Sequence, residues 1–167
     1  MQRAAQSLLY SKEISMVLIA QTETSIGCTA SHAFSVVSNM ERFSEWFPAV
    51  ISIQANNELP HGSVGKTYLE TVAVPMRGER KIELTVKESV ANERFVTEGK
   101  FHPLLPRMEI QINETGENLI SLQWSMFSRT NSAIARILLL PLAKGIMQKR
   151  ANIGSAKLKR LLEASNS

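Results

Sequence analysis

The residue types that most often carry out chemistry are few in this chain of 167 residues, and they are scattered. There are three histidines, one cysteine and no aspartate, so all fifteen acidic residues are glutamates. The lack of aspartate excludes EF-hand calcium loops, aspartate-held magnesium sites and aspartate-completed triads, although glutamate can take the last role. His32, His61 and His102 fall at a helix start, in a turn and in a loop, without the spacing of metal ligands. The sequence therefore predicts no metal and no cofactor.

Three other polar residues lie on two neighbouring extended segments. Tyr68 and Glu70 share the parity of one segment, and Arg80 opens the next. A buried carboxylate needs a partner, so a pair between Glu70 and Arg80 would give an interior one charged anchor for a ligand oxygen. In an enzyme, Tyr68, Glu70 or Arg80 would act as acid or base on an enolisable substrate. The alternative is that Glu70 and Arg80 lie in water at the end of a strand.

The single cysteine and the N-terminal residues predict a cytoplasmic protein. Cys28 has no disulfide partner in the chain and lies beside apolar residues, so we expect it to be buried and inert. The apolar run at residues 16–20 is too short for the core of a signal peptide or for a membrane span.

Positive charge is concentrated at the C-terminal end. From Arg129 onward there are eight basic residues and one acidic residue, Glu163, whereas residues 1–128 have eleven basic and fourteen acidic residues. A solvated basic helix face is one explanation, and contact with anionic lipid or an acidic partner is another. Nucleic acid is disfavoured as a partner, because no aromatic residue follows Phe127 to stack on bases.

Hydrophobic periodicity predicts one domain at residues 14–167 after an extension at residues 1–13. Residues 15–25 are typical of a strand, and residues 30–47 have helical spacing that breaks near Asn39, with Thr29 or Ser31 as N-cap. Alternating apolar positions then predict six antiparallel strands, with a tight turn at residues 114–117 before the last one.

Beyond Arg129 the period changes from two to about 3.6, which predicts a helix. Asn131 or Ser132 can cap it, and Pro141 should kink or restart it, because proline lacks the backbone donor. One stripe of this helix is apolar, with small residues where it crosses the sheet: Ala143, Met147, Ala151, Gly154, Leu158 and Leu161. Small residues at these positions predict either a close approach of helix and sheet or a hollow between them.

Two sequence segments resemble the START-like (SRPBCC) superfamily and, within it, the polyketide cyclase/dehydrase-type bacterial proteins. They are ASHAFSVVSNMERFSEWFPAV, which is similar to that family's helix pair, and the Gly62–Thr67 segment, which is similar to its Gly-x-x-Val-Gly strand opening. The resemblance covers residues 14–163. It implies an α+β helix-grip fold, in which a curved seven-stranded antiparallel sheet surrounds a long C-terminal helix, with a deep apolar cavity used for cyclisation, lipid or quinone carriage, or hormone sensing.

Strand parity nominates the residues that would line such a cavity. The expected lining residues are Tyr68, Val72, Val74, Ile82, Leu84, Phe95, Phe101, Ile110, Leu122, Trp124, Met147 and Ala151. Trp46, Phe47 and Pro48 lie where the family has its entrance loop and would form an apolar lip, or else pack against one another in a surface turn.

Three functions are compatible with this pattern. The first is a binding module that holds a small hydrophobic ligand without chemistry, because the expected lining has few convergent polar groups. The second is a cyclase- or dehydratase-like enzyme using Tyr68, Glu70 or Arg80. The third is a carrier that contacts a membrane or a ribosome through the basic C-terminal helix. The sequence leaves the oligomeric state open.

Overall fold

The computed structural model describes residues 16–165, so the extension predicted at residues 1–13 lies outside the described residues. The strands are β1 (Val17–Ile26), β2 (Val50–Ala55), β3 (Thr67–Val74), β4 (Gly78–Val90), β5 (Arg94–Gly99), β6 (Pro106–Gly116) and β7 (Leu119–Ser128). The helical segments are α2 (Ala30–Val37), η1 (Met40–Arg42), α3 (Phe43–Trp46), η2 (Ala135–Leu139) and α4 (Leu140–Ala164).

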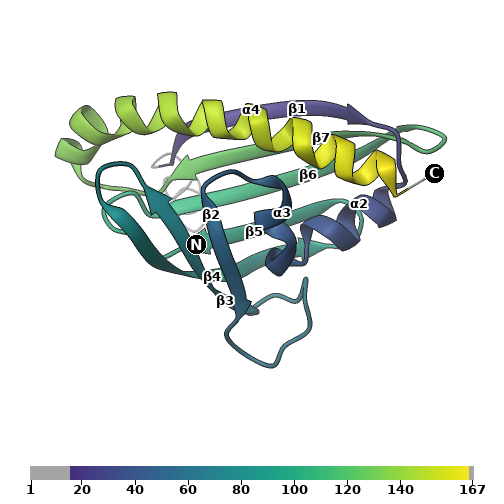
Figure 1. Ribbon diagram of the computed structural model, residues 1–167, viewed down its shortest axis with the longest axis horizontal. Helices are drawn as coiled ribbons and strands as arrows, with labels where there is room; N and C mark the ends of the chain where they lie inside the picture. The colour runs from purple at the N-terminus through teal and green to yellow at the C-terminus, as the bar shows by residue number, and fades with distance from the viewer. Residues whose placement is uncertain (1–15, 166–167) are drawn as a thin grey trace, which may run out of the picture.

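The strands form one antiparallel sheet, which curves around the C-terminal helix (Figure 1). Its order is β1-β7-β6-β5-β4-β3-β2, so the first two strands of the chain form opposite edges. Helix α4 runs along β1, whereas the sheet from β3 to β5 curves away from it. This arrangement confirms the predicted α+β helix-grip fold, since a one-sided apolar sheet must be covered and α4 is long enough to cover it.

The helical segments between β1 and β2 follow the predicted break and cap. Thr29 Oγ1 accepts a hydrogen bond of 3.1 Å from the backbone N–H of His32 and caps α2. Asn39 Oδ1 accepts one of 3.1 Å from the N–H of Glu41, so the chain restarts as η1 at the predicted position. These caps fix the direction in which α3 enters the interior.

The turn between β6 and β7 lies further along the chain than predicted. Strand β6 continues to Gly116, and the reversal occurs at Glu117 and Asn118. Asn118 has a φ of 51°, in the left-handed region that asparagine tolerates better than most residues. The predicted turn at residues 114–117 is therefore wrong in its position. Asn118 supplies the left-handed backbone conformation that the turn needs.

The start of the C-terminal helix contains an irregular turn. Ser132 Oγ accepts a hydrogen bond of 3.2 Å from the N–H of Ala135, which confirms one of the two predicted caps. Residues Ala135–Leu139 then form a π-helical turn, and Pro141 lies in the first turn of α4. Pro141 has no backbone N–H to donate to the preceding turn, and the turn before it is the wider π type. The predicted restart of the helix at Pro141 is therefore confirmed.

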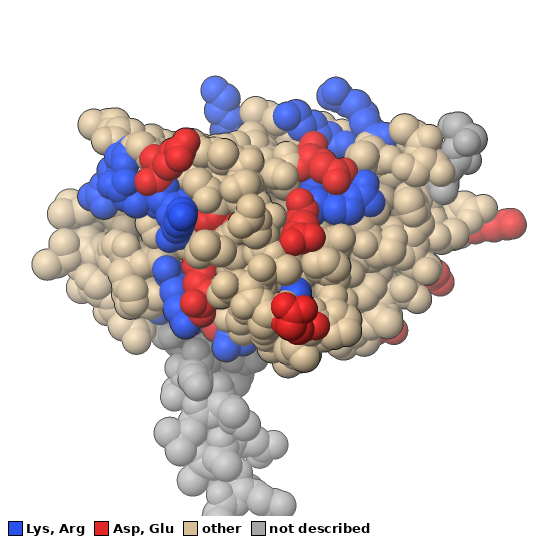
Figure 2. All heavy atoms as spheres, turned by 60° about the horizontal axis from the view of Figure 1, so that its bottom comes forward, with Lys and Arg blue, Asp and Glu red and all other residues tan. Residues whose placement is uncertain are grey.

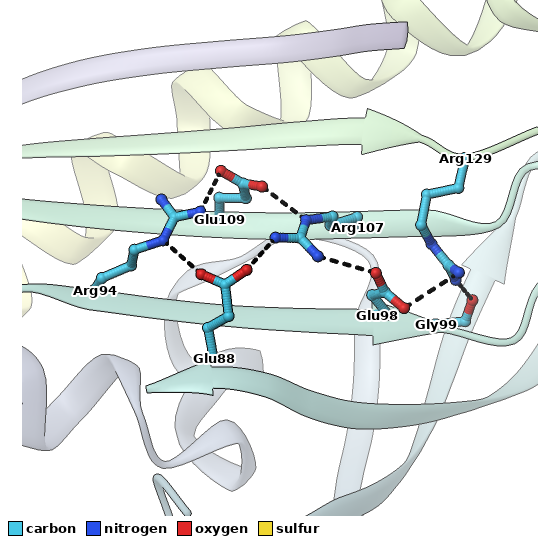
Figure 3. A network of polar contacts seen from close by, with 7 residues as sticks. All are labelled: Glu88, Arg94, Glu98, Gly99, Arg107, Glu109 and Arg129. Carbon is cyan, nitrogen blue, oxygen red and sulfur yellow. Dashed lines mark hydrogen bonds and ion pairs between the residues drawn. The ribbon is translucent and has the colours of Figure 1, made fainter. Parts of the chain in front are cut away.

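The face of the sheet opposite α4 carries a network of arginine and glutamate side chains (Figure 3). Arg107 contacts Glu88 at 2.6 Å, Glu109 at 2.7 Å and Glu98 at 3.0 Å, and Arg94 joins Glu88 to Glu109. Acidic and basic residues are also intermixed over the face seen in Figure 2. This face therefore carries no extended surface of one charge sign.

Replacing Arg107 with glutamine should lower the free energy of unfolding by about 2 kcal/mol at pH 7, because three carboxylates would keep their positions without their shared cation. The loss should shrink as the pH falls, since hydrogen bonds from Arg94 and Arg107 lower the pKa of Glu88. A carboxylate with a lowered pKa stabilises the fold above its unfolded-state pKa and loses that contribution as it is protonated.

Urea unfolding at several pH values measures this effect. Lys87→Gln is the matched control, because Lys87 is an exposed cation on β4. An equal loss of stability in the two variants, or a loss for Arg107→Gln that does not change with pH, would contradict the account.

Candidate functional site

The residues predicted to line the interior come together on the inner face of the sheet. All of them except Val74 belong to one apolar cluster or pack against it. Tyr68, Ile82, Leu84, Phe95, Ile110, Leu122, Trp124 and Ala151 are buried, and Val72, Val74, Phe101 and Met147 are half-buried. Most of these side chains therefore share one buried apolar region between the sheet and α4. Whether these side chains contact a ligand stays a prediction.

The small residues of α4 do not all have the same surroundings. A Cβ atom on Gly154 would lie 2.9 Å from Cδ2 of Phe47 and 3.5 Å from Cδ of Pro48, so α4 and the end of α3 are in close contact there. Phe47 also stacks on Phe43 and on Trp124, with ring centroids 4.8 Å and 5.1 Å apart. At Gly154, close packing and not a hollow explains the absence of a side chain.

This packing also places the three expected entrance residues. Trp46 and Phe47 are buried in the aromatic cluster, and Pro48 is half-buried against α4. Trp46, Phe47 and Pro48 therefore do not form an exposed apolar rim in this structure. A role for these residues at an entrance stays a prediction, and it would require the aromatic cluster to open.

Glu70 is the most unusual polar group of the inner face. It lies on β3 between Ile53 of β2 and Ile82 of β4, both of which are buried, and its own exposed fraction is 7%. Among residues 16–165, no group forms a hydrogen bond or ion pair with its carboxyl group. Burial raises the pKa of Glu70 to about 7. A carboxyl group at this position is therefore a proton donor below that pH and a buried anion above it.

The expected ion pair between Glu70 and Arg80 does not form. Arg80 pairs with Val72 across the β3–β4 ladder, two positions from Glu70, and its side chain is exposed and donates to the carbonyl of Glu79. Arg150 of α4 is a half-buried cation near the end of β3, and its Nη2 donates to the carbonyl of Ala73 at 3.2 Å. Burial lowers the pKa of Arg150, so this guanidinium is partly desolvated beside the end of β3.

Tyr68 belongs to a chain of polar contacts that the sequence did not reveal. Its hydroxyl group lies 2.8 Å from Nδ1 of His61, and Nε2 of His61 lies 3.6 Å from a carboxylate oxygen of Glu41. Burial raises the pKa of Tyr68 to about 12, so the phenol keeps its proton. Because this chain leads to the exposed His61, the Tyr68 hydroxyl is directed toward the β2–β3 loop.

Two tryptophans add hydrogen-bond donors to the interior. Trp124 on β7 and Trp46 on α3 are almost completely buried, and among the described residues no acceptor lies within hydrogen-bonding distance of either indole N–H. A buried donor without an acceptor is unfavourable unless water or a ligand supplies one. These two donors add polar atoms to the apolar interior that also contains the Glu70 carboxyl group.

Other classes of site find little support in the described part of the chain. No group of three or more metal-ligating side chains occurs among residues 16–165. Cys28 is fully buried, and burial raises the pKa of its thiol, as expected for an inert cysteine. A half-open hollow at Thr29 and the β6–β7 turn is lined by none of the predicted site residues. No helix of the described residues is long and apolar enough to cross a membrane.

Solved structures include close matches to this arrangement. A START superfamily protein from Mycobacterium smegmatis superposes with a TM-score of 0.69 at 14% identity, covering 89% of this chain and 97% of that chain. The di-domain ARO/CYC StfQ from the steffimycin biosynthetic pathway matches with a TM-score of 0.66 at 12% identity, over 93% of this chain and 52% of that one. Ara h 8.0201 matches with a TM-score of 0.65 at 12% identity, over 88% and 97% of the two chains.

The likeness lies in the structure and not in the sequence. No protein-family model matches the chain, and the comparison with curated proteins finds no similar sequence. At identities this low, the structural matches establish the fold alone. The chain has the START-like helix-grip fold that its two sequence segments predicted.

Proposed function

We propose that this START-like helix-grip chain binds a small hydrophobic ligand between the inner face of its sheet and α4. The observation that carries the proposal is Glu70, whose inward carboxyl group has no partner among residues 16–165 although it lies between buried isoleucines. Such a group requires a polar partner from water or from a ligand. Helix α4 packs mainly along β1 and reaches β3 through the hydrogen bond from Arg150 to Ala73, and this arrangement supports a ligand on the side of Glu70.

The chemistry of the lining describes the ligand. Most of the ligand would contact aliphatic and aromatic side chains, and one polar atom of the ligand would contact Glu70 or the indole N–H of Trp124. A lipid-, quinone- or polyketide-like molecule has this combination of a large apolar surface and a few oxygens. The ARO/CYC protein StfQ, from the steffimycin biosynthetic pathway, shares the fold and supports this class of ligand.

Binding of the apolar dye ANS tests the proposal through a change in dye fluorescence. Ala151→Trp should fill the space beside α4 and weaken dye binding at least tenfold, a change of about 1.4 kcal/mol. Ala156→Trp is the matched control, because Ala156 lies on the exposed side of the same helix. If Ala151→Trp unfolds the protein, the interior is a solid core. If it binds the dye as well as the control does, the ligand site lies elsewhere.

A cyclase- or dehydratase-like reaction is the second candidate function. It is favoured by the pKa of Glu70 near 7, which suits a group that both accepts and donates a proton near neutral pH. On this proposal, Glu70→Gln should lose turnover of an enolisable polyketide-like substrate but still bind it. A variant that keeps full activity would leave the binding function as the only one supported. Tyr68 and Arg80 are weaker candidates, since Tyr68 is directed toward His61 and Arg80 is exposed.

A further inference from the structure

The start of the C-terminal helix exposes an apolar surface that no part of the described fold covers. We call it the α4 apolar face, and it consists of Ile134, Ile137, Leu138 and Leu142. These side chains are between 64% and 72% exposed. Their spacing of three, one and four residues places them on one side of the helical turn. Neighbouring large apolar side chains with this exposure mark an interaction surface.

The α4 apolar face is held outward by contacts on the opposite side of the turn. Ala135 and Leu140 are buried and anchor the π turn to the body of the protein. Arg136 Nε donates to the carbonyl of Thr130 at 3.1 Å, and Ser132 caps the first turn. The exposed side chains therefore have a fixed direction, and they do not belong to a loosely attached end.

The charges around the α4 apolar face indicate an anionic partner. No acidic residue occurs from Arg129 to Leu162, and Lys144 and Lys149 follow on α4 with exposed side chains. The β3–β4 hairpin lies at the same end of the molecule (Figure 1), and its turn carries a fully exposed Met76 beside Arg77. A second copy of the chain would bring two basic surfaces together, which like-charge repulsion opposes.

We propose that the α4 apolar face docks the protein on an anionic phospholipid bilayer. The four side chains would enter the boundary between head groups and acyl chains, while Lys144 and Lys149 contact the lipid phosphates. Apolar side chains beside lysines match this interface, whereas a ribosomal RNA surface offers no apolar layer for four aliphatic side chains. The proposal does not depend on the ligand site, since it uses no residue of the inner face.

Flotation of the full chain with vesicles tests this surface. The vesicles are phosphatidylcholine alone or phosphatidylcholine with about one third phosphatidylglycerol. Wild-type protein should float with the anionic vesicles, and added salt should weaken this binding. The double variant Ile137→Ser, Leu138→Ser should bind them at least about tenfold more weakly. Lys144→Glu with Lys149→Glu should lose the preference for anionic vesicles.

The control is Val64→Ser with Val90→Ser, which removes two exposed apolar side chains outside the α4 apolar face and should bind as wild type does. Thermal unfolding checks that each variant is folded. Absence of wild-type binding to anionic vesicles, or full binding by the Ile137→Ser, Leu138→Ser variant, would overturn the proposal. It would also be overturned if wild-type protein does not float but forms dimers, or sediments with ribosomes, through these same residues.

Discussion

Replacing Glu70 with glutamine is expected to raise the free energy of unfolding by about 3 kcal/mol at pH 8 and to leave it nearly unchanged near pH 4. The reason is that burial raises the pKa of Glu70 from 4.5 to about 7. One pKa unit corresponds to about 1.4 kcal/mol between the two protonation states. Because the side chain is almost completely buried, solvent screens little of this effect.

The direction of the pH dependence follows from the raised pKa. Below the unfolded-state value, Glu70 is protonated in both states, and its ionisation has no effect on stability. Between pH 4.5 and about 7 the unfolded chain releases the proton but the folded chain retains it, so stability falls as the pH rises. Above about pH 7 the folded protein holds a buried anion, and the loss is complete. Glutamine cannot ionise, so the variant should lack this component of the pH dependence.

Urea unfolding of wild type and Glu70→Gln across this pH range measures the difference. Glu58→Gln is the matched control, because it makes the same chemical change at an exposed position in the β2–β3 loop. If the free energy difference between wild type and Glu70→Gln is the same at pH 4 and pH 8, the carboxyl group is paired or solvated, and its role as an unsatisfied inward group is wrong.

The second large effect is expected at Gly154. Gly154→Val should lower the free energy of unfolding by about 3 kcal/mol, since even a Cβ atom would lie 2.9 Å from Phe47. Phe47 cannot move aside easily, because it is stacked between Phe43 and Trp124. The variant should therefore move α4 away from α3 or break the aromatic stack.

Gly145→Ala provides a control on the same helix. A Cβ atom at Gly145 meets nothing within 4 Å, and alanine has a higher helix propensity than glycine by about 1 kcal/mol. This variant should be slightly more stable than wild type. Thermal unfolding followed by tryptophan fluorescence reports both effects, since Trp46 and Trp124 belong to the cluster that contacts Phe47. A Gly154→Val protein as stable as wild type would show that α4 is not held against α3.

Glu70 and Tyr68 show how much of the candidate site the sequence predicts. The period of two in the strands places Glu70 and Tyr68 on the inner face, because consecutive side chains alternate between the faces of a sheet. The absence of an ion pair at Glu70 depends on register. In the β3–β4 ladder Arg80 lies opposite Val72, two residues away from Glu70. A register shifted by two residues would leave every side chain on the same face of the sheet, so the pattern of apolar residues cannot distinguish the two registers.

The sequence pattern does not predict contacts made by loops, for a different reason. His61 lies in the β2–β3 loop and Glu41 in η1, and only the folded chain brings His61 to the Tyr68 hydroxyl and Glu41 to His61. Gly154 illustrates a choice that the sequence left open. A small residue on the inner side of a helix predicts either a hollow or a close approach, and the position of Phe47 decides for close approach. Periodicity predicts faces, whereas such partners depend on tertiary packing.

Native mass spectrometry of the protein, gently purified from the cells that produce it, tests the central claim most directly. The claim predicts a folded protein that carries a small organic molecule, which organic solvent releases and whose binding is lost in Ala151→Trp but retained in Ala156→Trp. A wild-type protein that carries no such molecule, and retains none after incubation with a lipid extract of those cells, would contradict the claim that this interior is a ligand-binding site.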